Sequence, residues 1–325
     1  MRVLIIGGAG MVGQKLANRL AGDASWTGKI NELILYDVVS AQKPGAAFAI
    51  KTMTGSLADA SQSQTLAALK PDLIFHLAAI VSGDAEKNFE KGWDINARGS
   101  WYLLEALRAE HEASAGSYVP KLIFTSSIAV FGPPFPDKIG DDFLCAPMTS
   151  YGAQKAMTEL LVADYSRKGM IEGLSIRLPT ICVRPGKANL AASSFFSGII
   201  REPLNGQEAI LPVSDSVRHW HASPRSAAGF LAHAANIDLA PLGGRRSLNL
   251  PGVSCTVAEQ IEALRKIAGE DVVKLIKPAP DETINAIVKN WPRDFDPQLA
   301  TSLGFEAEKS FEEIIQVYME DDLPK

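Results

Sequence analysis

Tyr151 and Lys155 are four residues apart, a spacing that places both side chains on one face of a helix, one turn from each other. A tyrosine ordinarily has a pKa of about 10, which is too high for a proton acceptor at neutral pH. A cation nearby can lower such a pKa by roughly 1 to 3 units. The pair could therefore supply a phenolate base with an ammonium group beside it. Alone, the spacing is a weak signal, because a surface tyrosine beside a solvated lysine has it too.

A glycine loop near the N-terminus is the second feature that could do chemistry. Val3–Ile6 is a short apolar run rich in β-branched residues, which predicts a buried parallel strand. After it, Gly7 allows a tight turn, Gly10 allows the backbone to approach a pyrophosphate, and Gly13 allows the next helix to pack close to the strand. The N-terminus of that helix would face the phosphates. The sequence therefore predicts a dinucleotide-binding strand–loop–helix unit.

The second predicted strand, Glu32–Asp37, ends in a carboxylate. An acid at this point accepts hydrogen bonds from both hydroxyls of the adenine ribose. It would repel the 2′-phosphate of NADP, and Val38, Val39 and Ser40 offer no arginine to receive that phosphate. The sequence therefore predicts NAD as the cofactor rather than NADP.

The glycine loop, the hydroxyl run 125–127 and the Tyr-x-x-x-Lys pair follow one another in an order that resembles the extended short-chain dehydrogenase/reductase family, also called the NAD-dependent epimerase/dehydratase family. The resemblance covers nearly the whole chain. It implies an α/β fold, with a doubly wound parallel sheet (Rossmann) and a smaller C-terminal substrate-binding cap. It also implies reversible hydride transfer to NAD, with Tyr151 as the base and Lys155 holding the nicotinamide ribose.

The resemblance also assigns roles to other residues. Counting back five positions from Gly132 gives Ser127 as the catalytic hydroxyl, with Ser126 as second choice. The family's acid beside the adenine is replaced here by Ser56. His76 lies inside an apolar strand, where a histidine is more often a core residue than a catalytic one. The expected cofactor-binding residues are Gly7, Gly10, Met11, Val12, Gly13, Asp37, Ser56, Leu57, Leu77, Ala78, Ala79, Asn96, Tyr151, Lys155, Pro179 and Ile181.

Regularity drops in the second half of the chain, where short helical patterns alternate with loops over 191–200, 222–235 and 257–268, before a closing amphipathic helix over 305–319. Such a segment cannot build a large sheet of its own. We expect residues 1–180 to form the NAD-binding domain and 181–325 to form mostly the cap, with some segments returning to the main domain. A crevice between the two is the expected ligand site.

Within the cap, residues 216–221 resemble the family's Arg-Asp-Phe-hydrophobic-His stretch, except that His219 replaces the acid. Arg218 is the first candidate for binding an anion, because a guanidinium binds a carboxylate or phosphate through two parallel hydrogen bonds. Two histidines at alternate positions without a third ligand make a poor zinc site, so we expect no metal. The expected substrate-binding residues are Ser82, Ser126, Ser127, Arg184 and Arg218.

The expected reaction narrows further. No Asp-Glu pair of the dehydratase type follows Ser127, since Ile128 and Ala129 stand there, and this argues against sugar-nucleotide dehydration. The cap motifs resemble family members that oxidise the 2-hydroxyl of a small sugar acid. Two alternatives stay open: an epimerase or reductase acting on a nucleotide sugar, and a non-catalytic NAD sensor. Sensors typically lose the tyrosine or lysine, and both are present here.

Composition sets wider bounds. The 325 residues are enough for one large or two modest domains, and 46% are apolar, so a sizeable core can form. The net charge of −5 is dispersed and gives no nucleic-acid footprint. The three cysteines lie far apart and indicate free thiols in a reducing compartment. With no apolar run of about 18 residues and no room for a signal peptide, we expect a cytoplasmic protein with no membrane partner. We also expect a homo-oligomer, a dimer or tetramer.

Overall fold

The computed structural model describes residues 1–186 and 192–324, so the expected helix start at Ala191 lies outside the described residues. The chain forms two compact units. Unit 1 comprises Met1–Ser127, Thr149–Arg177 and Ala228–Leu248. Unit 2 comprises Ile128–Met148, Leu178–Ala227 and Asn249–Lys325.

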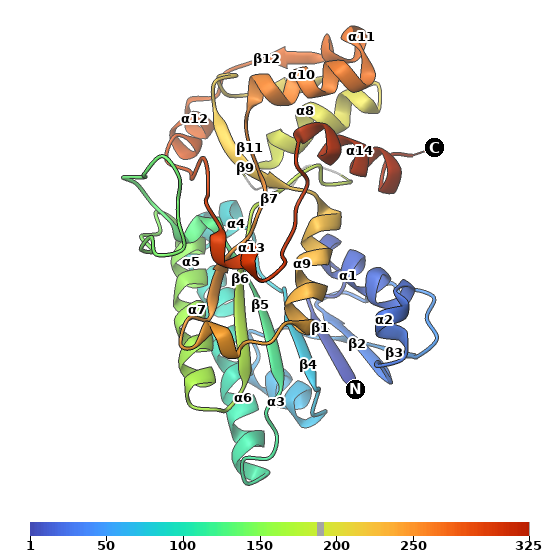
Figure 1. Ribbon diagram of the computed structural model, residues 1–325, viewed down its shortest axis with the longest axis vertical. Helices are drawn as coiled ribbons and strands as arrows, with labels where there is room; N and C mark the ends of the chain where they lie inside the picture. Colours follow the sequence, from blue (N-terminus) through green and yellow to red (C-terminus); the bar gives the residue numbers. More distant parts are fainter. Residues whose placement is uncertain (187–191, 325) are drawn as a thin grey trace. The chain divides into compact units, whose positions relative to one another are not determined.

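Unit 1 is built on a seven-stranded sheet with the order β10-β6-β5-β4-β1-β2-β3 (Figure 1). Its strands are β1 Arg2–Ile6, β2 Glu32–Asp37, β3 Ala49–Thr54, β4 Leu73–His76, β5 Lys121–Ser127, β6 Glu172–Leu178 and β10 Ser247–Asn249. From β3 through β5 every pairing is parallel. The order reverses at β1, which lies between β2 and β4, and ligands of such sheets bind beyond the carboxyl ends of the strands at this point. The predicted doubly wound sheet is confirmed, and two predicted strands, 32–37 and 121–127, have the observed bounds.

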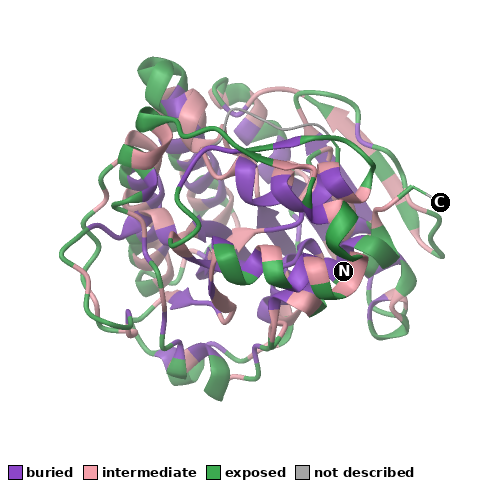
Figure 2. Ribbon diagram, turned by 90° about the horizontal axis from the view of Figure 1, so that it is seen from above, coloured by how far each residue is buried: buried purple, intermediate pink, exposed green. Residues whose placement is uncertain are grey.

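Helices cover both faces of this sheet. They are α1 Met11–Gly22, α2 Ala24–Thr27, α3 Ala60–Ala68, α4 Ser82–Lys87, α5 Phe89–Gly92, a π-helical turn Trp93–Arg98, α6 Gly99–Ala113, α7 Ser150–Arg167, α9 Pro224–Asn236 and a 3₁₀ turn Ala240–Leu242. Helices α3, α6 and α7 share a core with the strands on one face, and α1 and α9 lie on the other (Figure 1). Residues 3–6 of β1 are fully buried, as the purple strands of Figure 2 illustrate. Burial on both faces explains why these strands are continuous apolar runs in the sequence.

Unit 2 contains short elements and two small sheets, ordered β11-β9-β7 and β12-β8. The elements are a 3₁₀ turn Ile128–Val130, β7 Thr180–Ile181, α8 Ser194–Leu204, β8 Ala209–Leu211, β9 Arg218–Ala222, β11 Val253–Thr256, α10 Val257–Ala268, α11 Glu270–Val273, β12 Ile276–Pro278, α12 Glu282–Val288, α13 Gln298–Ser302 and α14 Phe311–Asp321. Helix α10 has the predicted bounds. Helix α14 begins six residues later than expected, because the Ser310 hydroxyl accepts a hydrogen bond from the Glu313 backbone N–H and caps the helix there.

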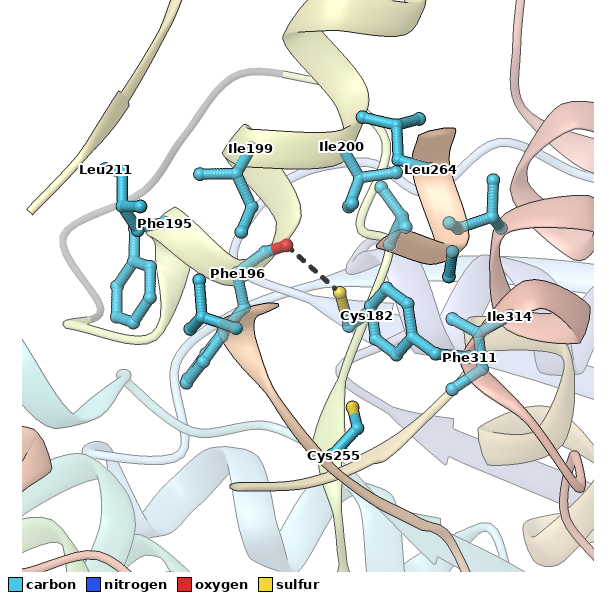
Figure 3. Packing of buried hydrophobic residues seen from close by; sticks show 14 of the residues in the cluster. Cys182, Phe195, Phe196, Ile199, Ile200, Leu211, Cys255, Leu264, Phe311 and Ile314 are labelled. Carbon is cyan, nitrogen blue, oxygen red and sulfur yellow. Dashed lines mark hydrogen bonds between the residues drawn. The ribbon is translucent and has the colours of Figure 1, made fainter. Parts of the chain in front are cut away.

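The core of unit 2 packs α8, α10 and α14 around two buried thiols (Figure 3). Cys182 donates a weak hydrogen bond to the carbonyl of Phe196, at 3.4 Å. Burial raises the pKa of Cys182 and of Cys255 to about 12, so both thiols stay protonated and unreactive at neutral pH. In the described part of the chain, no helix is long and apolar enough to cross a bilayer.

Candidate active site

Two of the three glycines in the loop after β1, Gly7 and Gly13, have no room for a side chain. Gly7 has a φ of +92°, and a Cβ there would lie 2.7 Å from the backbone nitrogen of Ala78. A Cβ on Gly13 would lie 2.2 Å from the Gly7 carbonyl oxygen, so this glycine brings α1 against the loop. A Cβ on Gly10 would meet only that carbonyl, at 3.4 Å. Gly10 therefore has open space on its outer side, and the approach of a pyrophosphate to it stays a prediction.

The start of α1 can receive a diphosphate. Gly10 caps the helix without a side-chain hydrogen bond, and the first turn has no acidic residue. The first-turn N–H groups of Met11, Val12 and Gly13 have no acceptor within the helix, and the helix dipole adds partial positive charge. These groups fit the phosphates of NAD.

Asp37 ends β2 next to this loop. Its two carboxylate oxygens accept hydrogen bonds from the backbone N–H groups of Ala9, at 2.9 Å, and Val38, at 2.7 Å. A carboxylate has about four acceptor positions, so two remain for the hydroxyls of a ribose. The backbone thus fixes Asp37 in an orientation that suits the adenosine half of NAD.

Two further predicted segments lie beside this loop. The N–H groups of Leu77 and Ala78 both donate to the Ile6 carbonyl, at 2.8 and 3.0 Å, which places the loop of Leu77, Ala78 and Ala79 against Gly7. The Gly55 N–H donates to the Asp37 carbonyl at 3.0 Å, and this bond holds the segment of Ser56 and Leu57 next to the end of β2. The Ser56 hydroxyl accepts from the Ala58 N–H at 3.3 Å, and Leu57 is buried in the core.

Ser127, Tyr151 and Lys155 come together in unit 1. Helix α7 begins at Ser150 because Thr149 accepts a hydrogen bond from the Gly152 N–H, so Tyr151 lies in its first turn. The hydroxyls of Ser127 and Tyr151 are hydrogen-bonded. The Lys155 ammonium donates to the Thr125 carbonyl at 2.7 Å and lies 5.6 Å from the centre of the Tyr151 ring. The three predicted catalytic residues therefore form one cluster at the end of β5.

Burial controls the protonation of this cluster. It raises the pKa of Tyr151 to about 12, against the opposing effect of the Ser127 hydrogen bond. It lowers the pKa of Lys155 to about 7, with the nearby Glu159 carboxylate opposing the shift. The sequence predicted that nearby positive charge lowers the pKa of Tyr151; in this structure burial is the largest cause and raises it. Tyr151 thus keeps its proton at neutral pH unless a further positive charge lies beside it.

The Ser126 hydroxyl bonds to Glu159 rather than to Tyr151. Its hydroxyl donates to Glu159 at 2.5 Å, and Glu159 forms a buried ion pair with Arg177 at 2.7 Å. The geometry therefore favours Ser127 over Ser126 as the hydroxyl beside Tyr151. The Glu159–Arg177 pair was not predicted from the sequence. The position of Glu159, one helical turn after Lys155, was the only available signal.

Asn96 supports the loop after β4, whereas its predicted contact with the cofactor stays a prediction. Its side chain accepts from the Ile80 N–H at 2.9 Å and donates to the Ile80 carbonyl at 3.2 Å. It also donates to the Gln154 side chain at 2.8 Å, which ties the loop to α7 beside Lys155. Ser82 begins α4 two residues after Ile80. Gln154 was not predicted, although it is adjacent to the lysine of the motif.

The two predicted anion-binding arginines, both in unit 2, have different surroundings. Arg218 forms an ion pair with Glu259 at 3.1 Å and donates to the Ser254 carbonyl at 3.2 Å. Arg184 is half-buried, which lowers the pKa of its guanidinium, and donates to the Ser193 hydroxyl at 3.3 Å. Among residues 1–186 and 192–324, no carboxylate pairs with Arg184. Arg184 is thus the better placed of the two to bind an external carboxylate.

Pro179 and Ile181 flank Thr180 just after β6. Ile181 pairs with Ala222 in the small sheet of unit 2, and the Thr180 hydroxyl lies 2.6 Å from His219. This contact was not predicted, although the sequence pointed to both the segment around Thr180 and residues 216–221.

His76 is buried and hydrogen-bonded to Ser100 at 2.8 Å, so it is a core residue as predicted. No cluster of side chains in the described residues is suited to hold a metal ion.

Comparison with known proteins agrees with this geometry. Residues 3–238 match the NAD dependent epimerase/dehydratase family. The chain belongs to this family. It is an NAD-dependent oxidoreductase, and the glycine loop, the α1 N-terminus and Asp37 described above fit that cofactor.

Three relatives span essentially the whole chain. The D-erythronate dehydrogenase of Cupriavidus necator is 43% identical over 99% of this chain and 98% of its own length. The D-erythronate dehydrogenase of Haemophilus influenzae is 41% identical over 99% and 100%. The crystal structure of the nucleoside-diphosphate-sugar epimerase from Agrobacterium tumefaciens is 54% identical, with a TM-score of 0.96, and covers 99% of this chain and 94% of its own.

Proposed function

We propose that the protein oxidises the 2-hydroxyl of a small sugar acid with NAD, converting D-erythronate to 2-oxo-D-erythronate. The observation that carries the proposal is full-length similarity to two proteins named D-erythronate dehydrogenase. The clustering of Ser127, Tyr151 and Lys155 supports it, because these groups suit the removal of a proton from an alcohol.

Ser127, Tyr151 and Lys155 have different roles in the proposed reaction. Bound NAD supplies the hydride acceptor. Ser127 donates a hydrogen bond to the reacting oxygen and fixes its direction. Tyr151, as phenolate, takes the proton of the 2-hydroxyl, while the hydrogen on C2 leaves with its electron pair and the C–O bond becomes a carbonyl. Lys155, held by the Thr125 carbonyl, favours the phenolate when it is charged and is in position to hold the nicotinamide ribose.

Arg184 is our candidate for binding the substrate carboxylate, because it is half-buried and has no carboxylate partner in the described residues. Arg218 is the competing candidate, but it would first have to leave Glu259. Loss of a charged hydrogen bond costs about 1.5 to 3 kcal/mol, roughly a 10- to 150-fold drop in kcat/KM. Arg184→Lys should show this drop through KM, with Arg218→Lys as the matched comparison. The reverse ranking would assign the carboxylate to Arg218.

The deciding experiment is a screen of NADH formation by the wild-type protein with a panel of four- to six-carbon sugar acids. D-erythronate should give the highest kcat/KM, and the product should be the 2-oxo acid. If no sugar acid reduces NAD, the proposed function is wrong.

The crystal structure that is 54% identical gives a second candidate, a nucleoside-diphosphate-sugar epimerase. An epimerase returns the hydride to its substrate, so it would invert a sugar carbon without net formation of NADH. Incubation with nucleoside-diphosphate sugars, followed by chromatographic analysis of the sugars, separates the two candidates.

We also propose a homo-oligomer, a dimer or tetramer. Trp101 on α6 and Leu160 on α7 are large apolar side chains exposed on one unit. Light scattering coupled to size-exclusion chromatography tests this, and a monomeric mass at micromolar concentration would contradict it.

A further inference from the structure

Helix α7 contacts strand β5 at three successive turns. Tyr151, Lys155 and Glu159 are spaced four residues apart, so their side chains lie on one face of the helix. Each of them bonds to one of the last three residues of β5, in the pairs Tyr151–Ser127, Lys155–Thr125 and Glu159–Ser126. Glu159 thus belongs to the same contact as the two groups assigned to proton transfer, although the proposed reaction gives it no role.

The Glu159 carboxylate is buried and fixed within unit 1. Its residue is 4% exposed. Arg177 donates to it through Nε, at 2.9 Å, and through Nη2, at 2.7 Å, one bond to each carboxylate oxygen. The Ser126 hydroxyl donates to Oε1 at 2.5 Å. Hydrogen bonds of this kind favour the ionised carboxylate, so Glu159 presents a negative charge in the interior.

Lys155 is also buried, and its ionisable neighbours come from three elements. The groups around it are the Phe124 ring and Thr125 carbonyl of β5, His76 of β4, Tyr151 and Glu159 of its own helix, and Arg177 of β6 behind Glu159. His76 is neutral, because burial lowers its pKa to about 3. The Phe124 ring, 4.5 Å from the ammonium, attracts it weakly. Of these groups, Glu159 is the one that is negative while Tyr151 keeps its proton.

The charge of Lys155 depends on two opposing effects. Burial disfavours the ammonium, because it removes water from the charge. An opposite charge one helical turn away favours the ammonium, and the low dielectric of the interior strengthens that attraction. The balance brings the pKa of Lys155 to about 7, so a change in either effect alters the charged fraction near neutral pH.

We propose that Glu159 is a positioning residue for the proposed reaction, because its fixed carboxylate retains the proton on Lys155. A charged Lys155 favours the Tyr151 phenolate, so Glu159 acts on proton transfer through Lys155 and not by contact with the substrate. Arg177 orients the carboxylate and offsets part of its charge. The inference rests on the proposed function and deepens it, since it names the group that sets the charge beside the base.

The first test measures the pKa of Lys155 directly. In full-length protein labelled with carbon-13 at the lysine Cε atoms, the NMR signal that Lys155→Arg removes identifies the residue. Glu159→Gln keeps the size of the side chain and removes its charge, so the pKa of Lys155 should fall by roughly 1 unit or more, with NAD bound or absent. Asp164→Asn removes an exposed carboxylate from the same helix and should leave that pKa unchanged. An unchanged pKa in Glu159→Gln would overturn the inference.

A double variant separates charge from packing and avoids an unpaired buried charge. Glu159→Gln leaves the Arg177 guanidinium buried without its counterion, which destabilises the fold. Glu159→Gln/Arg177→Met removes both charges. If Glu159 acts by charge, the pKa of Lys155 should fall in the double variant too, but by less, because the Arg177 cation no longer opposes the ammonium. A double variant with the wild-type pKa would contradict the proposal.

The kinetic test follows the same proton through the pH dependence of turnover. Lys155 loses its charge at lower pH in Glu159→Gln, so the loss of kcat with the best sugar acid should grow as the pH rises. For a shift of about 1 unit in the pKa of Lys155, the loss should approach about tenfold at high pH and shrink at low pH. Glu159→Asp keeps the charge and should keep the wild-type pH profile. A purely structural role would lower kcat equally at every pH.

Failure of the inference and failure of the proposed function give different results. A loss of kcat that does not depend on pH would remove Glu159 from proton transfer, even if the pKa of Lys155 falls, and the proposed function would stand. If wild-type protein oxidises no sugar acid, the proposed function fails. The NMR titration then decides by itself whether Glu159 retains the proton on Lys155.

Discussion

The Ser126–Glu159–Arg177 cluster of unit 1 and the Thr180–His219–Pro292 cluster of unit 2 both bury polar groups, but with opposite electrostatic character. The first is an ion pair with a carboxylate close enough to raise the pKa of Lys155. The second is neutral, and burial keeps it so. Charge acts over several ångströms and sets protonation, whereas a neutral hydrogen bond acts only on its partner and sets direction. Unit 1 thus contains the charged cluster, next to Lys155, and unit 2 contains the neutral one.

The largest effect should follow from removing the proton acceptor of unit 1. Tyr151→Phe should lower kcat about 100- to 10,000-fold while NAD still binds, because a general base contributes that much. Tyr165→Phe, on the same helix and bonded to Glu105, is the matched control and should retain activity. Steady-state kinetics and a fluorescence titration with NAD measure both. Near-normal turnover by Tyr151→Phe would place the base elsewhere.

Breaking the charged cluster should cost stability. Arg177→Met leaves the Glu159 carboxylate buried without its partner, which typically costs about 3 to 5 kcal/mol. Arg167→Met removes an exposed ion pair with Asp164 and should cost about 1 kcal/mol or less. Denaturant unfolding of the two variants measures the difference. If both variants lose the same small amount of unfolding free energy, the buried pair stabilises the fold no more than the exposed one.

Low pH should destabilise the fold through its buried neutral histidines, one of which, His219, belongs to the neutral cluster. Burial lowers the pKa of His76 to about 3 and of His219 to about 4, and that of His221 well below 6.5. The unfolded chain takes up these protons near pH 6.5 and the folded protein does not. Stability is therefore complete above about pH 6.5 and falls as the pH drops toward 4, by up to about 1.4 kcal/mol per pH unit for each histidine.

Unfolding midpoints between pH 7 and pH 4 measure this loss. His219→Gln removes one of the three groups and should make the slope shallower. An unchanged slope would mean that His219 takes up its proton at the same pH in the folded and the unfolded protein, and this would contradict the neutral character of the cluster.

The smallest effect should come from removing the Asp37 carboxylate, which is predicted to set the preference for NAD over NADP. Asp37→Ala should reduce the preference for NAD over NADP about tenfold, because two ribose hydrogen bonds and the repulsion of the 2′-phosphate are lost. Ser56→Ala removes a neutral hydroxyl, which cannot repel the 2′-phosphate, so this variant should leave the preference intact. Ratios of kcat/KM with the two cofactors decide this. A wild type that uses NADP as well as NAD would contradict the role of Asp37.

The parts of the fold and site that the sequence predicted are those set by local spacing. The glycine loop, strand β5 and helix α7 could each be found from residues within a few positions of one another. Glu159 and Arg177 are 18 positions apart, and their pairing depends on how α7 packs against β6. No local pattern in the sequence predicts that packing, so the pair could not be predicted.

Long-range pairing also limited the prediction for unit 2. Thr180 and His219 are 39 positions apart, and His219 was noted only as a departure from the family pattern. The partners of Arg218 lie on β11 and α10, about forty positions away. Arg218 was therefore ranked above Arg184 by motif alone, without knowledge that Glu259 pairs with it.

The chain passes between the two units five times, after residues 127, 148, 177, 227 and 248. No single cut can release either unit as a continuous fragment. Strand β10, at the edge of the large sheet, comes from residues that the ribosome adds about seventy positions after β6. The sheet cannot be completed before β10, Ser247–Asn249, has been synthesised, so a nascent chain stalled after β6 exposes an unpaired strand edge to chaperones.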